Sequence, residues 1–94
     1  MELASFLEGM YMPLTGISER TVTLYRYTIK SFSEHLGHAA TLDDLNEINV
    51  AGFLLARSKT RSAATVAKDR AQLRALCYFS HSSILRPHSS FKVA

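Results

Sequence analysis

The chain has 94 residues, of which 47% are hydrophobic and 20% are charged, and this composition is ordinary for a soluble globular domain. A chain of this length holds one domain with one core and leaves too little surface for a separate substrate cleft, so we expect a binding module or a piece of a larger protein and not an autonomous enzyme. A single cysteine excludes a disulfide framework, the apolar runs are too short to span a membrane, and we expect a cytoplasmic protein.

The net charge of +3 conceals a strong asymmetry between the two parts of the chain. Residues 1–56 carry three basic and seven acidic side chains, a net charge of −4, whereas residues 57–94 carry eight basic side chains and one acidic, a net charge of +7. A skew of this size in a small domain favours a polyanionic partner such as nucleic acid. The alternative is a solvated basic helix that has no partner.

The first seventeen residues predict a short helix followed by a loop. The apolar side chains of residues 2–10 fall on one side of a helix: Leu3, Phe6, Leu7 and Met10. Pro13 and Gly16 are expected to end this helix, so residues 12–17 are predicted to form a loop.

Ser18 opens a stronger helix, predicted over residues 18–36, because its hydroxyl suits an N-cap and Gly37 suits the position after the helix. Apolar residues recur every three or four positions and form a core stripe: Val22, Tyr25, Ile29, Phe32 and Leu36. The other face carries side chains that are either solvated or available to a partner: Arg20, Thr23, Tyr27, Lys30 and Ser31.

Residues 38–58 predict a short connection followed by a compact helix. Thr41 and Asp44 resemble a capping box with Asp in place of Glu, which predicts a helical turn over residues 42–45. Asn49 is expected to cap a helix over residues 50–58. Four apolar side chains of this region are expected to reach the core: Ile48, Val50, Phe53 and Leu54.

The longest uninterrupted helical pattern covers residues 62–79 and begins at Ser62, a suitable N-cap. Its core stripe repeats at helical spacing: Ala63, Val66, Leu73, Leu76 and Cys77. Lys68 points away from this stripe. Residues 57–61 form a basic approach to the helix, and Thr60 and Ser62 are small enough to let the backbone approach a phosphate.

Beyond residue 79 the helical pattern weakens, and Pro87 is expected to end any regular structure before a tail at residues 88–94. The sequence has no glycine-rich phosphate loop and no set of metal ligands at a usual spacing. His35 and His38 suit the C-terminal end of a helix, where the helix dipole favours a cation. We therefore expect neither a metal ion nor a cofactor.

The order of these features resembles one known family. The segments that carry the resemblance are Ser18-x-x-Thr21-Val22-x-x-Tyr25, Thr41-Leu42-x-x-Leu45, Asn49-Val50-x-x-Phe53-Leu54, Ser62-x-x-Thr65-Val66, Leu73-Arg74 and Phe79. In this order, over residues 18–86, the chain resembles the N-terminal core-binding domain of tyrosine recombinases of the phage-integrase type. Each segment alone combines only a helix cap with an apolar stripe, so the resemblance depends on their order and spacing.

The resemblance implies an all-α fold, a small orthogonal four-helix bundle of the SAM-like type. It implies that the domain forms one half of a clamp around double-stranded DNA and that its partners include other recombinase protomers, with no membrane and no small-molecule substrate. The positions that match the DNA face of the family are Arg20, Thr21, Thr23, Tyr27, Lys30, Lys59, Arg61, Ser62, Thr65 and Lys68.

Three positions differ from the family pattern or extend it. Gln72 is an additional candidate for DNA contact. Ala64 stands where some members of the family present a longer side chain. Arg70 stands where the family usually has an aliphatic residue, so its stem is expected to pack while its charged head, like that of Arg74, lies at the edge of the core stripe.

The family's chemistry belongs to a second, C-terminal domain that carries an Arg, a His-x-x-Arg and a nucleophilic Tyr. The four tyrosines of this chain lack such neighbours, so we assign no catalytic residue: Tyr11, Tyr25, Tyr27 and Tyr78. The expected organisation is an N-terminal segment at residues 1–17, a core-binding domain at 18–86, and at 87–94 a tail or the start of a linker to an absent catalytic domain. The alternative function is a SAM-like module that binds another protein.

Overall fold

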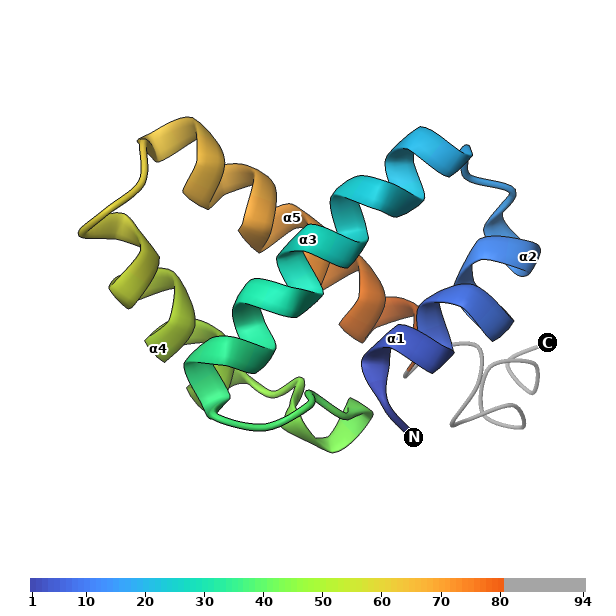
Figure 1. The fold of residues 1–94 in the computed structure, drawn as a ribbon, viewed down its shortest axis with the longest axis horizontal. Helices are drawn as coiled ribbons and strands as arrows, with labels where there is room; N and C mark the ends of the chain where they lie inside the picture. The colour runs from blue at the N-terminus through green and yellow to red at the C-terminus, as the bar shows by residue number, and fades with distance from the viewer. Residues whose placement is uncertain (81–94) are drawn as a thin grey trace, which may run out of the picture.

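The computed structural model describes residues 1–80, and all of the regular structure in this range is helical (Figure 1). The described residues form the predicted small all-α bundle and contain no β-strand. The predicted helix end at Pro87 and the predicted tail at residues 88–94 lie outside the described residues. No helix of the described part is long and apolar enough to cross a lipid bilayer.

The N-terminal segment is nearly continuous helix and consists of α1 (Leu3–Phe6), the π-helical turn η1 (Leu7–Tyr11) and α2 (Met12–Thr15). The predicted loop is wrong for residues 12–15, which are helical. Pro13 does not end the helix because it lies in the first turn of α2, directly after the wider π turn, where a missing N–H is tolerated. Gly16 ends it with a φ of 71°, a conformation that favours glycine.

The predicted helix after Ser18 is confirmed as α3 (Glu19–Leu36). The Ser18 hydroxyl accepts a hydrogen bond of 3.2 Å from the N–H of Thr21, and Gly37 ends the helix with a φ of 84°. The core stripe is buried as predicted, with Leu36 packed beside it: Val22, Tyr25, Ile29 and Phe32.

The third segment contains the short 3₁₀ turn η2 (Leu42–Asp44), where the predicted capping box between Thr41 and Asp44 is present, and α4 (Glu47–Ser58). The predicted cap at Asn49 is wrong, because Asn46 caps α4 and its side-chain oxygen accepts the N–H of Asn49 at 2.9 Å. The helix therefore begins one turn earlier than predicted. This start places Ile48 on the outer face with 84% of its surface exposed, so its predicted place in the core is also wrong.

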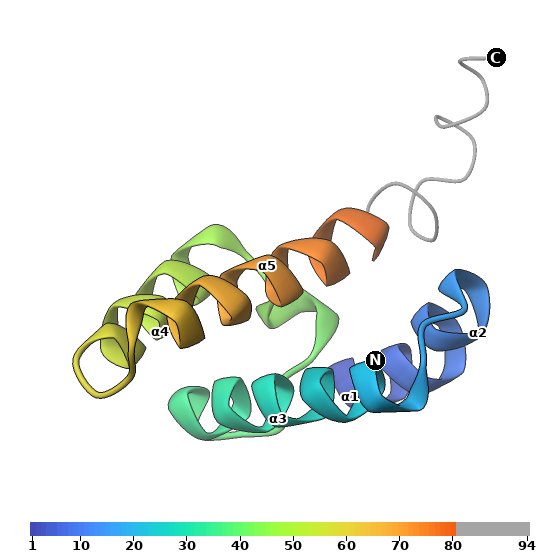
Figure 2. The same cartoon turned by 90° about the horizontal axis from the view of Figure 1, so that it is seen from above.

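The last described helix, α5 (Ala63–Phe79), crosses α3 near the middle of both helices (Figures 1 and 2). The Ser62 hydroxyl accepts the N–H of Thr65 at 3.3 Å, which confirms the predicted cap. Figure 2 shows two layers, with α1 and α3 in one and α4 and α5 in the other.

The core lies between these layers and is closed by aromatic pairs. Phe32 of α3 meets Phe53 of α4 edge to face, with their ring centroids 5.3 Å apart. Tyr11 of η1 meets Phe79 of α5 in the same way at 5.1 Å. Such pairs add to the burial of their rings, so they bind the N-terminal segment to α5 and α3 to α4.

Candidate nucleic-acid interface

The outward face of α3 is the first of two basic surfaces. The predicted contact residues Arg20, Thr23, Tyr27 and Lys30 are exposed on it, and Thr21 is half-buried at its start. The Thr23 hydroxyl donates to the Glu19 carbonyl at 3.1 Å, which holds this side chain along the helix. Tyr27 has 64% of its surface exposed, so its ring and hydroxyl are open to contact.

The second basic surface begins in the link between α4 and α5. Lys59, Arg61 and Ser62 are exposed, and Thr65 is half-buried in the first turn of α5. The Ser62 hydroxyl lies 3.2 Å from that of Thr65, so the two polar side chains share one small site at the helix start. One turn further on, the Lys68 Nζ lies 3.3 Å from the Asp69 carboxylate.

The N-terminal ends of α3 and α5 lie on the same side of the point where the two helices cross (Figure 1). In Figure 1, α3 begins at the upper right and α5 begins at the upper left, so both N-terminal halves rise above the point where the helices cross. The partial positive charge of a helix lies at its N-terminus. Two helix dipoles therefore add to the cationic side chains on this side.

Ion pairs determine which cations stay available. Arg26 pairs with Glu8 at 2.8 Å, and Arg57 pairs with Asp69 at 2.8 Å. Lys68 also lies within ion-pair distance of Asp69. Within residues 1–80, no carboxylate lies within ion-pair distance of the four remaining cations of the two surfaces: Arg20, Lys30, Lys59 and Arg61. These four cations are among the residues that the sequence predicts as DNA contacts.

A buried polar cluster at the helix crossing was not predicted. The side chain of Asp69 is fully buried, and its Oδ2 accepts the Nε–H of Arg57. Thr28 and Gln72 are buried beside it, and the Thr28 hydroxyl donates to Gln72 Oε1. Gln72 therefore faces the core, and its assignment as an additional DNA contact is wrong.

The sequence contains a signal for this cluster. Asp69 follows Val66 by three positions and precedes Leu73 by four, so it lies within the apolar stripe of α5. A charged residue in a core stripe requires a buried partner. Arg57 supplies that partner from α4, and its guanidinium lies over the Phe53 ring with the Cζ 5.5 Å from the ring centroid.

The tyrosines divide into buried and exposed pairs. The hydroxyls of Tyr11 and Tyr25 lie 3.3 Å apart in the core. Burial, with a further contribution from the hydrogen bond to Tyr11, raises the pKa of the Tyr25 phenol well above its ordinary value, which disfavours the phenolate that a nucleophile needs. Tyr27 and Tyr78 are exposed on α3 and α5.

The His38 imidazole lies at the end of α3, with its Nε2 2.9 Å from Oδ2 of Asp44. The N–H of Thr41, followed in size by the His38 contact, holds the pKa of the Asp44 carboxyl below its ordinary value. In the part of the chain that the structure describes, no group of three or more His, Cys, Asp and Glu side chains is arranged to hold a metal ion.

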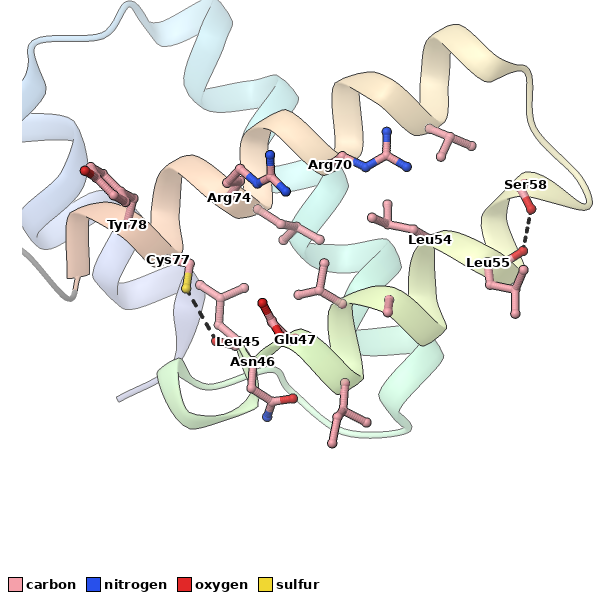
Figure 3. Close-up of a pocket in the computed structure, with 15 residues that line it drawn as sticks. Leu45, Asn46, Glu47, Leu54, Leu55, Ser58, Arg70, Arg74, Cys77 and Tyr78 are labelled. Atoms are coloured by element: carbon pink, nitrogen blue, oxygen red, sulfur yellow. Dashed lines mark hydrogen bonds between the residues drawn. The ribbon is translucent and has the colours of Figure 1, made fainter.

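A groove of about 900 Å³ runs between α4 and α5 (Figure 3). Its floor is apolar and includes Val66 and Leu73 of α5 and Leu54 of α4. Figure 3 shows Arg70 and Arg74 along the α5 side of the groove, and both are exposed as predicted for residues at the edge of the stripe. On the α4 side, Ile48 and Leu55 are exposed.

Comparison with known proteins points to one family. A family model described as phage integrase, N-terminal SAM-like domain, matches residues 4–82. This match includes most of the N-terminal helical segment as well as α3, α4 and α5. Comparisons with curated proteins and with solved structures found no match.

Proposed function

The chain belongs to the phage integrase N-terminal SAM-like domain family, a domain of tyrosine recombinases, and from this membership we propose that it binds double-stranded DNA as one half of a clamp. The domain carries out no chemistry in this proposal. The residues that contact DNA are those on the two basic surfaces: Arg20, Thr21, Thr23, Tyr27, Lys30, Lys59, Arg61, Ser62, Thr65 and Lys68.

One observation carries the proposal: α3 and α5 begin on the same side of the helix crossing (Figure 1), and unpaired cations lie at both starts, Arg20 on α3 and Lys59 and Arg61 just before α5. Two helices that cross at their middles present two separate rows of side chains. A DNA duplex has two phosphate backbones, so each row can contact one of them. Lys and Arg side chains, hydroxyls, backbone N–H groups and helix N-termini are the usual donors to phosphate oxygens.

Backbone contacts dominate the proposed interface. Lysines, arginines and short hydroxyl side chains outnumber the Asn and Gln side chains that read adenine. Gln72, the one amide that was a candidate, is buried. We therefore propose binding that tolerates many sequences, with a dissociation constant of roughly 10⁻⁴–10⁻⁶ M for this domain alone at physiological salt.

The salt dependence of binding tests this proposal. Fluorescence anisotropy with a labelled duplex gives the affinity at several salt concentrations, and each cation that contacts a phosphate adds about one unit to the slope of log K against log salt. Arg61→Ala and Lys68→Ala are each expected to weaken binding and to lower the slope by about one unit.

Arg26→Ala is the matched control, because Arg26 is exposed but paired with Glu8. It removes one positive charge without removing a proposed contact. An equal loss of slope in Arg26→Ala and in Arg61→Ala would mean that net charge, and not this surface, determines binding.

A second function, association with another protomer, is favoured by the groove between α4 and α5. Ile48 and Leu55 are 84% and 65% exposed beside an apolar floor. The arginines on the other rim suit an acidic surface, and residues 1–56 of a second copy carry a net charge of −4. A second copy of this chain is therefore the proposed occupant.

Sedimentation velocity of the wild type and of Ile48→Glu tests this second function. We expect a dimer at high protein concentration that Ile48→Glu abolishes without changing DNA affinity. A wild type that sediments as a monomer at millimolar concentration would exclude self-association, and binding of an unrelated acidic helix would then be the remaining use of the groove.

A further inference from the structure

The polar cluster at the crossing of α3 and α5 joins three helices through one buried carboxylate. Asp69 of α5 accepts the Nε–H of Arg57 of α4 at 2.8 Å on Oδ2. Its Oδ1 lies 3.3 Å from the hydroxyl of Thr28 of α3. The Thr28 hydroxyl has one proton, and it lies within hydrogen-bond distance of three acceptors: Oδ1 of Asp69 and Oε1 of Gln72 on α5, and the Leu24 carbonyl on α3 itself.

We propose that Asp69 is a positioning residue for DNA binding, although it is too deeply buried to touch DNA. The inference rests on the proposed function. Asp69 fixes the crossing of α3 and α5 and the position of α4 beside it. The crossing in turn determines the separation of the two basic surfaces, so the domain reaches both sets of phosphates only while the cluster is intact.

Each basic surface is connected to this cluster by a stretch of helix, called an arm below, that acts as a rigid rod. Arg20 precedes Thr28 by eight residues, and Ser62 precedes Asp69 by seven. At a rise of 1.5 Å per residue the arms are about 12 Å and 10 Å long. A rotation of about 10° at the crossing therefore moves each arm's end by roughly 2 Å, enough to break a hydrogen bond to a phosphate.

Lys68 is the cation that links the cluster to the surface. Its Nζ lies 3.3 Å from Oδ1 of Asp69, but its side chain is 38% exposed. Arg57 is 17% exposed and stays with the carboxylate. Because Arg57 remains hydrogen-bonded to Asp69, Lys68 is free to turn to a phosphate without leaving a buried charge unpaired.

Asp69→Asn separates a positioning role from an effect of net charge, because the two explanations predict opposite changes in DNA affinity. Loss of a negative charge makes the domain more basic and by itself tightens DNA binding. Loss of the positioning contact weakens it, by about tenfold if one or two charge-assisted contacts are lost. The experiment is anisotropy with labelled duplex DNA, at conditions where circular dichroism shows each variant folded.

A second pair of variants keeps the inference testable if Asp69→Asn does not fold. Thr28→Val removes the hydroxyl at nearly constant shape and charge, whereas Thr28→Ser retains it. We expect about threefold weaker binding in Thr28→Val, the effect of one weakened hydrogen bond, and wild-type affinity in Thr28→Ser. Leu73→Ala is the control for stability alone, because it weakens the core without touching the cluster.

The outcomes distinguish the inference from the function on which it rests. The positioning role of Asp69 is supported if folded Asp69→Asn binds DNA more weakly than the wild type. It is also supported if Thr28→Val binds more weakly while Thr28→Ser and folded Leu73→Ala do not. Wild-type or tighter binding by folded Asp69→Asn and Thr28→Val overturns it and leaves the proposed function intact. A wild type that binds no duplex overturns the proposed function and the inference together.

Discussion

The Nε of Arg57 donates a hydrogen bond of 2.8 Å to Oδ2 of Asp69, whose side chain is completely shielded from solvent. The pair connects the last turn of α4 to the middle of α5. In the part of the chain that the structure describes, it is the most deeply buried ion pair, since Arg57 is 17% exposed whereas the basic partners of the other pairs are 38–56% exposed: Arg26, His38 and Lys68.

Arg57→Met is expected to destabilise the domain strongly, because it leaves a buried carboxylate without its main partner. Breaking such a pair costs about 3–5 kcal/mol, and we expect the lower end because Lys68 lies close by. Urea unfolding followed by circular dichroism gives the free energy of unfolding.

Arg26→Met is the control for that measurement. It breaks the Arg26–Glu8 pair, in which both side chains are about half exposed, and such pairs are worth at most about 1 kcal/mol. Equal destabilisation by Arg57→Met and Arg26→Met would contradict the structural role given to the buried pair.

Leu73→Ala tests the core of α5. Leu73 is fully buried, so the substitution is expected to cost about 2–5 kcal/mol, which is a large part of the stability of a domain this small. Ile48→Ala removes a similar apolar side chain from the surface and is expected to change the free energy of unfolding by less than about 0.5 kcal/mol. The reverse order of the two effects would show that the inner faces of α4 and α5 are assigned incorrectly.

Asp44→Asn tests the capping box through its pH dependence. Hydrogen bonds from Thr41 and His38 stabilise the Asp44 carboxylate and lower its pKa in the folded state below the ordinary value of 3.8. This contribution is therefore present above pH 3.8 and is lost as the pH falls through the lower pKa of the folded state. We expect Asp44→Asn to have a lower Tm than the wild type at pH 6, and the difference to shrink toward zero as the pH falls below 3.8.

Asp43→Asn is the matched control for Asp44→Asn, because Asp43 is its exposed neighbour and carries the same charge. Its Tm is expected to follow that of the wild type across the same pH range. A constant Tm difference for Asp44→Asn from pH 6 to strongly acidic solution would exclude the carboxylate as the source of the effect.

Ser62→Asp separates the two roles of this residue. Aspartate caps a helix as well as serine does, so the free energy of unfolding is expected to change by less than about 0.5 kcal/mol. The new negative charge would lie where a phosphate is proposed to bind, so DNA affinity is expected to fall about tenfold or more. Thermal unfolding and duplex anisotropy measure the two effects on the same samples.

Asn46→Asp makes the same kind of change at the cap of α4, which begins at the lower side of the molecule in Figure 1, away from the starts of α3 and α5. It adds one negative charge at a helix N-terminus that is not part of the proposed interface. Equal losses of affinity in Asn46→Asp and Ser62→Asp would show that binding depends on net charge alone.

Local features of the fold were predictable from the sequence because short-range contacts determine them. Ser18 and Ser62 cap helices through the N–H three residues further on, and Gly37 is adjacent to the helix it ends. These contacts lie within one turn of helix, so spacing along the chain is sufficient to identify them.

Features that depend on tertiary packing were predicted less well. Asn46 and Asn49 are three residues apart and are equally suitable caps, so only the packed structure distinguishes them, and the one-turn difference moves Ile48 from the core to the surface. From the sequence, Asp69 is known only as the one acidic residue among the basic residues 57–94. Its partner Arg57 is twelve residues away on another helix, and no local pattern connects the two.

In the candidate site too, local features were predictable from the sequence and features that depend on tertiary packing were not. The outward positions on α3 and at the start of α5 follow from helical periodicity, which assigns the core stripe and therefore the opposite face. Periodicity along single helices could not establish how these faces lie relative to each other, because that depends on how α3 and α5 cross (Figure 1).

Titration of isotope-labelled protein with duplex DNA, followed by amide NMR, tests the central claim most directly. The account predicts that amide signals move at residues 21–30 of α3 and residues 61–68 of α5, while those of Ile48 and Leu55 in the groove stay in place. Non-specific DNA contacts ordinarily have a dissociation constant of about 10⁻⁴ M or below, so about 1 mM DNA is enough to detect them. Shifts confined to the groove, or no shifts at that DNA concentration, would contradict the proposed DNA interface.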